Sequence, residues 1–204
     1  MTPLPSNRAA SRRAWLLAGA GAVAAAAARR SAAAAPPDAS AFAANFEGMR
    51  LRDQDDRAFR LDSLAGRVVL FHFVFTGCST ICPAQTHVLA EVQRGLGADV
   101  RRRVHFVSVS VDPLADTPAA LRAFALRMGA DLRTWSFVTG RPEDIDRLAD
   151  RLRLFRAAPG AVRPGDHATA LWLVDARGRL AQRYGGNPPD AIRLGQELAT
   201  YARL

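Results

Sequence analysis

Residues 68–83 read VVLFHFVFTGCSTICP, an apolar run followed by a short turn, two cysteines and a proline. The run is rich in β-branched and aromatic residues, which favours a buried strand. Proline is tolerated at the first position of a helix, so the stretch predicts a strand, a loop and a helix that begins at Pro83. The two sulfur atoms would then lie where unpaired helix N–H groups and the positive end of the helix dipole favour anions.

Cys78 and Cys82 are the only two cysteines in the 204 residues. A position at a helix N-terminus lowers the pKa of a thiol and promotes the thiolate, which binds metals and attacks disulfides. A disulfide across so short a loop would constrain little of the unfolded chain, so a purely structural role explains the pair poorly. The sequence therefore predicts sulfur chemistry or the binding of a soft metal ion.

Strands and helices are expected to alternate on either side of this stretch. Residues 51–61 favour a hairpin, because weak alternation surrounds the turn-forming DQDD of residues 53–56. Further strands are expected at 104–111, 135–138, 168–174 and 179–184, and helices at 83–96, 116–128, 142–152 and 188–201. The order predicts an α/β fold with a central mixed β-sheet flanked by helices and an N-terminal β-hairpin extension. With a closing strand–strand–helix and a dithiol after an early strand, it resembles the thioredoxin-like fold.

A histidine is a candidate third ligand beside the two cysteines. His167 ends a loop rich in Ala, Pro and Gly, residues 157–167, and precedes an expected strand. In a thioredoxin-like fold, the loop that enters this strand faces the active-site cysteines. Two thiolates favour Cu(I), and an added imidazole lets the same site hold Cu(II). The alternative is a histidine that belongs only to a surface loop. Of the other histidines, His72 is expected in the core. His87 and His105 are expected at the surface or in structural roles.

The formal net charge of +9 raises the question of a nucleic-acid partner. Five of the 28 basic residues and none of the 19 acidic residues lie in residues 1–35. The rest of the chain therefore holds 23 basic and 19 acidic residues. Such a small excess, scattered among Asp and Glu, is typical of a solvated surface. No nucleic-acid partner is expected.

Residues 1–35 are expected to be a twin-arginine-type signal peptide. Residues 11–17 read SRRAWLL, which resembles the twin-arginine motif, and residues 14–28 carry no charge. This uncharged stretch is shorter than the ~20 residues that span a bilayer, and the small residues after it offer cleavage sites. We expect an exported protein, in the periplasm or on the outer face of the cytoplasmic membrane, with a membrane tether if the leader is kept. Residues 36–45 are expected as a linker and 46–204 as the folded domain.

Four segments in order resemble the Sco/SenC family, over about residues 45–203. They are FTGCSTICP at 75–83, VSVDP at 109–113 with DTP at 116–118, DH at 166–167 and LVDARG at 173–178. The resemblance implies a thioredoxin-fold metallochaperone that delivers copper to the binuclear CuA centre of cytochrome c oxidase, or that reduces the cysteines of that centre. It implies Cys78, Cys82 and His167 as ligands of Cu(I) or Cu(II). The implied partners are the oxidase subunit that bears the CuA site and other copper chaperones or thiol reductases.

The chain departs from the family pattern between the cysteines, where residues 79–81 are uncharged and many members carry an acidic residue. Three activities stay open. A metallochaperone would hold copper on the two cysteines and His167. A thiol–disulfide oxidoreductase would use Cys78 and Cys82 as catalytic residues and would not need the histidine. A peroxidase is disfavoured, because Phe75 stands where the loop of such enzymes needs a proline.

Overall fold

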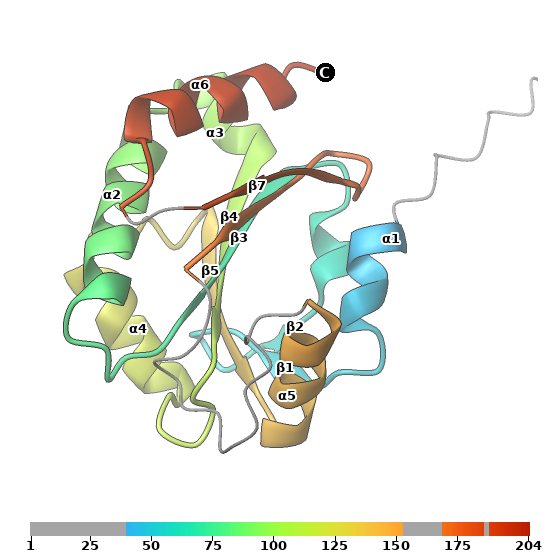
Figure 1. The fold of residues 1–204 in the computed structure, drawn as a ribbon, viewed down its shortest axis with the longest axis vertical. Coiled ribbons are helices and arrows are strands. Elements are labelled where there is room, and N and C mark those ends of the chain that lie inside the picture. Colours follow the sequence, from blue (N-terminus) through green and yellow to red (C-terminus); the bar gives the residue numbers. More distant parts are fainter. Residues whose placement is uncertain (1–39, 153–168, 186–187) are drawn as a thin grey trace, which may run out of the picture. The chain divides into compact units, whose positions relative to one another are not determined.

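A seven-stranded sheet in the order β2-β1-β5-β4-β3-β6-β7 organises the described part of the chain (Figure 1). The computed structural model describes residues 40–152, 169–185 and 188–204, all within a unit that spans Pro36–Leu204. The strands are β1 (Leu51–Arg52), β2 (Ala58–Phe59), β3 (Val68–Val74), β4 (Val104–Ser110), β5 (Trp135–Gly140), β6 (Leu171–Val174) and β7 (Leu180–Tyr184). The predicted α/β class with a mixed thioredoxin-like sheet is confirmed.

Parallel strands form the middle of the sheet, and antiparallel strands form its edges. β4 pairs in parallel with both β3 and β5, whereas β6 runs antiparallel to β3 and β7 runs antiparallel to β6. Every residue of β3 and β4 is buried. Strands covered on both faces read as continuous apolar runs, which explains the sequence of residues 68–74.

Helices cover both faces of the sheet (Figure 1). They are α1 (Ser40–Ala43), α2 (Ile81–Gly95), α3 (Ala98–Arg103), α4 (Pro118–Arg127), α5 (Pro142–Arg151) and α6 (Ala191–Tyr201), with 3-10 turns η1 (Ala44–Phe46) and η2 (Leu61–Leu64). Apolar residues of α2, α4 and α6 form one buried cluster with Leu70 of β3. Residues of α1, η1 and α5 form a second cluster with Phe71. Successive residues of β3 therefore enter the two cores, as strand geometry requires.

The helix after the dithiol begins earlier than predicted, at Ile81 rather than Pro83. Pro83 is thus the third helical residue, which is tolerated because the first four N–H groups of a helix lack an intrahelical acceptor. The helix expected at 116–128 is present as α4 and begins at Pro118, where the Thr117 side chain caps it by accepting a hydrogen bond from the Ala120 N–H at 3.2 Å. Helix α3 was not expected; among its six residues only Val100 is buried.

The N-terminal hairpin is confirmed, and β1 joins it to the sheet through antiparallel pairing with β5. The end of the stretch expected as a linker forms α1, where Phe42 is 4% exposed. The Phe42 and Phe71 rings lie 5.7 Å apart, and the Phe42 N–H donates to the Gly178 carbonyl at 3.2 Å. The expected leader, residues 1–35, lies outside the described residues. Of the helices that are described, none is long and apolar enough to cross a membrane.

Asp144 of α5 fastens the hairpin to the rest of the domain. Its buried carboxylate accepts hydrogen bonds from the Arg50 backbone N–H at 3.1 Å and from Arg141 Nε at 2.8 Å, and it also pairs with Arg147. The Arg141 hydrogen bond outweighs the effect of burial and, with the other donors, lowers the pKa of Asp144 to about 2. The folded state therefore favours the ionised carboxylate.

We expect Asp144→Asn to lower the free energy of unfolding at pH 7 by about 2 kcal/mol, from a pKa of about 2 when folded against 3.8 ordinarily. Because the folded pKa is depressed, this stabilisation is complete above about pH 4 and is lost as the pH falls towards 2. Urea unfolding at pH 7 and pH 3 measures it, with the exposed Asp146→Asn of the same helix as control. An equal loss at both pH values would contradict the assignment.

Candidate functional site

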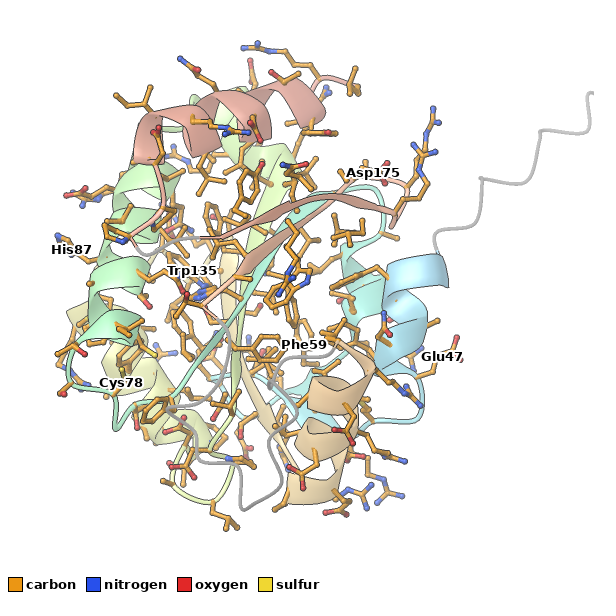
Figure 2. The ribbon with its side chains drawn as sticks, in the orientation of Figure 1. Glu47, Phe59, Cys78, His87, Trp135 and Asp175 are labelled. Atoms are coloured by element: carbon orange, nitrogen blue, oxygen red, sulfur yellow. The ribbon has the colours of Figure 1, made fainter. Side chains whose placement is uncertain are left out.

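The two cysteines meet where β3 ends and α2 begins. Cys78 lies in the intervening loop and is half-buried, whereas Cys82 is the second residue of α2 and is 2% exposed. The Cys82 backbone N–H donates to Cys78 Sγ at 3.3 Å, and neither cysteine forms a disulfide. Figure 2 shows Cys78 beside the first turn of α2. The sulfur of Cys78 thus occupies the anion-favouring position that the sequence predicts.

Backbone N–H groups make Cys78 the more acidic thiol. Partial burial alone would raise its pKa, but hydrogen bonds from the backbone of Cys82, Thr80 and Ile81 outweigh that effect and lower the pKa below its usual 9.0. These donors are the unpaired N–H groups at the start of the helix. Cys78 is therefore the thiol that is ready to act as a thiolate donor or nucleophile.

Cys82 holds its proton far more strongly. Burial is the main cause that raises the pKa of its thiol to about 12; the nearby Cys78 sulfur and Asp116 carboxylate also raise it, and a hydrogen bond with the Phe75 backbone opposes them. The pair thus combines an accessible, acidic thiol with a buried, protonated one. A metal ion that binds both sulfurs must displace the proton of Cys82.

Asp116 ties the dithiol loop to the loop after β4. Its fully buried carboxylate accepts hydrogen bonds from the Thr76 N–H at 3.1 Å, from the Thr76 hydroxyl at 2.5 Å and from the Ser110 hydroxyl at 2.6 Å. Within the described ranges no ion pair neutralises this carboxylate. The sequence placed Asp116 only at the start of the helix expected at 116–128 and did not predict this role. The hydroxyl residues that could have indicated it are Thr76, after β3, and Ser110, at the end of β4.

The third predicted ligand, His167, lies outside the described residues, as does its loop 157–167. Among the residues that are described, no three His, Cys, Asp or Glu side chains are grouped to hold a metal ion. The chain is placed again from Thr169, whose carbonyl accepts a hydrogen bond from Gln85 Nε2 of α2 at 2.8 Å. Because β6 runs antiparallel to β3, its entry lies beside the end of β3 that leads to the dithiol.

The remaining histidines occupy the roles expected of them. His72 is fully buried inside β3, and His87 is exposed on α2, 3.6 Å from Glu91. His105 begins β4 and is 7% exposed; its Nε2 lies 2.9 Å from the Ser136 hydroxyl. Burial, aided by the charge of Arg67, lowers the pKa of His105 to about 4, so this ring is neutral at physiological pH.

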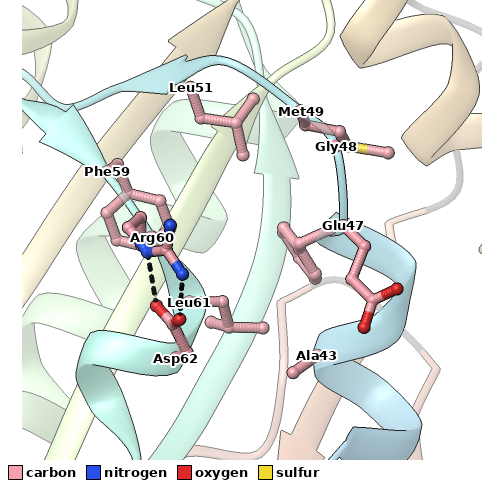
Figure 3. Close-up of a pocket in the computed structure, with 10 residues that line it drawn as sticks. Ala43, Glu47, Gly48, Met49, Leu51, Phe59, Arg60, Leu61 and Asp62 are labelled. Carbon is pink, nitrogen blue, oxygen red and sulfur yellow. Dashed lines mark hydrogen bonds and ion pairs between the residues drawn. The ribbon is translucent and has the colours of Figure 1, made fainter.

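Two hollows flank the hairpin. One, of about 270 Å³, is lined by apolar residues such as Phe46 and Phe59 and by the ion pair of Arg60 with Asp62 (Figure 3). Neither Cys nor His lines it. The other, of about 760 Å³, extends to Asp116 and so approaches the loop that this carboxylate ties to the dithiol.

Residues 34–203 match the protein-family model described as SCO1/SenC. The "SCO1 protein homolog" of Bacillus subtilis (strain 168) is 33% identical over 144 residues, which are 69% of this chain and 73% of that protein.

Solved structures are similar over nearly the same span. BsSco, described as having a disulfide switch and as a member of the Sco family of cytochrome c oxidase assembly proteins, is 28% identical with a TM-score of 0.62, over 76% of this chain and 91% of its own. Bradyrhizobium japonicum ScoI with copper bound is 27% identical with a TM-score of 0.61, over 75% of this chain and 96% of its own.

Proposed function

Because the chain belongs to the SCO1/SenC family, we propose that it binds copper through Cys78, Cys82 and His167 and delivers it to the CuA centre of cytochrome c oxidase. Support comes from the copper bound to Bradyrhizobium ScoI and from the family to which BsSco is assigned. The dithiol suits the cargo, because soft thiolates select Cu(I) and an imidazole extends the site to Cu(II).

The observation that carries the proposal is the difference in acidity between the two thiols. Cys78, with its lowered pKa, offers a thiolate to an incoming Cu(I) ion. Cys82 then joins as the second ligand when its proton leaves, since bound cations drive deprotonation of a coordinating thiol. Transfer proceeds by ligand exchange, in which thiolates of the acceptor replace those of the chain one at a time, without a change in oxidation state.

The position of Thr169 supports His167 as the third ligand. Thr169 is held against α2, and two residues of chain reach at most about 7 Å, so the backbone of His167 lies within that distance of Thr169. The first residues of α2 carry Cys82. A histidine that extends from this backbone towards the start of α2 would complete an S₂N ligand set.

A thiol–disulfide oxidoreductase that reduces the cysteines of the CuA site is the second candidate, favoured by the same difference in acidity. The Cys78 thiolate would attack a disulfide of the partner, form a mixed disulfide and release one partner thiolate. Cys82, after losing its proton, would attack the Cys78 sulfur and release the second partner thiol. The chain then carries a Cys78–Cys82 disulfide, and the two electrons have passed to the partner.

We propose the periplasm or the outer face of the cytoplasmic membrane as the place of action. Residues 1–35 support this location, because SRRAWLL is followed by an uncharged stretch and small residues. The acceptor would be the oxidase subunit that bears the CuA site. Other copper chaperones or thiol reductases would load copper or restore the reduced dithiol.

We expect the reduced chain to bind one copper ion and His167→Ala to weaken Cu(II) binding by about 100-fold or more, about 2.7 kcal/mol. Cu(I) affinity should change by less than about tenfold, because two thiolates can hold Cu(I) alone. Metal analysis and competition with chelators of known affinity measure both. The exposed His87→Ala is the control, and a His167→Ala chain that binds Cu(II) as the parent does would remove His167 from the site.

A further inference from the structure

A row of hydrogen bonds crosses the core between the sheet and α2 and ends at the entry to β6. Trp135 Nε1 lies 2.7 Å from the Ser108 hydroxyl, which lies 2.6 Å from His72 Nε2. His72 Nδ1 lies 3.3 Å from Gln85 Oε1, and Gln85 Nε2 lies 2.8 Å from the Thr169 carbonyl. All four side chains are at most 2% exposed, and Trp135, at the far end of the row, is labelled in Figure 2.

The row has one direction. A backbone carbonyl only accepts, so the Gln85 amide nitrogen must face Thr169 and the amide oxygen must face His72. His72 Nδ1 therefore carries the proton that Gln85 accepts. In the neutral ring, His72 Nε2 then accepts from the Ser108 hydroxyl, whose oxygen accepts from Trp135. Every donor in the row thus points towards Thr169.

Burying an amide and an imidazole in an apolar core is costly unless their polar atoms are satisfied. Here each named atom has a partner, and the outcome of the row is a fixed position for the Thr169 carbonyl. Gln85 follows Cys82 by three residues on α2, a spacing that places two side chains on one helix face. The Gln85 side chain therefore links α2, which carries Cys82, to the entry of β6, which follows His167 in the chain.

We propose that Gln85 is a positioning residue for the copper site: its hydrogen bond to Thr169 fixes the backbone from which His167 extends relative to the helix that carries Cys82. The proposal rests on the proposed function, because it takes His167 as a ligand. Both polar atoms of the Gln85 amide are engaged by His72 and Thr169, so we assign it no contact with copper or with the acceptor. Because Gln85 acts on the site only through the entry of β6, its loss should lower the affinity for Cu(II), which needs the imidazole. The affinity for Cu(I), which the two thiolates hold, should stay nearly unchanged.

The experiment compares two buried glutamines of α2 in the full reduced chain. Gln85→Leu removes the bond to Thr169, whereas Gln93→Leu removes the bonds that the fully buried Gln93 makes with Asp131 and Thr134. Both substitutions delete a buried amide, but the second lies away from the dithiol. We expect Gln85→Leu to weaken Cu(II) binding by about tenfold or more, as outer-shell changes do, to alter the Cu(II) electron paramagnetic resonance spectrum and to leave Cu(I) affinity within about twofold. Gln93→Leu should change neither affinity.

Several results would overturn the proposal. One is parent-like Cu(II) binding by Gln85→Leu, or by the less disruptive Gln85→Met if the first variant does not fold, while His167→Ala weakens it. Another is an equal loss of Cu(II) affinity in Gln93→Leu, which would indicate general destabilisation. Nitrogen chemical shifts that place the His72 proton on Nε2 would reverse the row. If His167→Ala itself binds Cu(II) normally, the proposed ligand set fails and Gln85 has no ligand to position.

Discussion

Cys82→Ser should lower the affinity for Cu(I) by about 1,000-fold or more, about 4 kcal/mol. The substitution removes one of two soft sulfur donors and replaces it with a hydroxyl, which is a poor ligand for Cu(I). Cys82 is 2% exposed at the second position of α2, where serine is nearly isosteric, so the fold should persist. Competition against a Cu(I) chelator of known affinity, under reducing conditions, measures the loss.

The control for this prediction is Ser79→Ala, which changes an exposed hydroxyl between the cysteines and leaves both sulfurs in place. Its Cu(I) affinity should match that of the parent. Near-ultraviolet circular dichroism of both variants shows whether the aromatic core is intact. Retention of Cu(I) by Cys82→Ser to within about tenfold of the parent would mean that the dithiol is not the copper site.

Alkylation by iodoacetamide at pH 7.5 should proceed at Cys78 at least ~100-fold faster than at Cys82, because only the thiolate reacts. With a pKa of about 12, Cys82 is a thiolate in only about one molecule in 3 × 10⁴ at this pH. Cys78 has a pKa below 9.0 and is more exposed. Mass spectrometry that locates the added group on Cys78 or Cys82 at successive times measures both rates.

The pH dependence makes this second prediction sharper. The rate at Cys78 should rise with pH, reach half of its maximum at its pKa, below pH 9, and level off above it, whereas the rate at Cys82 should still be rising steeply at pH 10. Cys78→Ser and Cys82→Ser chains give each rate separately. Similar rates at the two sulfurs, or a common plateau, would show that the helix N-terminus does not distinguish them and would remove the chemical basis for a nucleophile and a resolving thiol.

The parts of the fold that depend on neighbouring residues could be predicted from the sequence. The buried run of β3, the Thr117–Pro118 start of α4 and the placement of Cys78 at a helix N-terminus all follow from local patterns. Helix α1 could not be predicted, because Phe42 is held by Phe71 and Gly178, which are distant in sequence.

The supporting residues of the candidate site escaped prediction for the same reason. Asp116 bonds to Thr76 across 40 positions of sequence, and Gln85 bonds to Thr169 across 84. Hydrogen bonds of that kind are set by which strands become neighbours in the sheet, and no periodicity in the chain records them. The reactive sulfurs carry a local signature, whereas the groups that hold their surroundings in place do not.

The contact between Phe42 and the turn before β7 has a mechanical consequence. This turn also accepts a hydrogen bond from Gly66, just ahead of β3, so the chain enters the domain at the end of the sheet where β3 starts. The seven residues of β3 carry the backbone about 20 Å from there to the dithiol. A force applied at Phe42 would therefore load the sheet at the end where β3 starts, which is remote from Cys78.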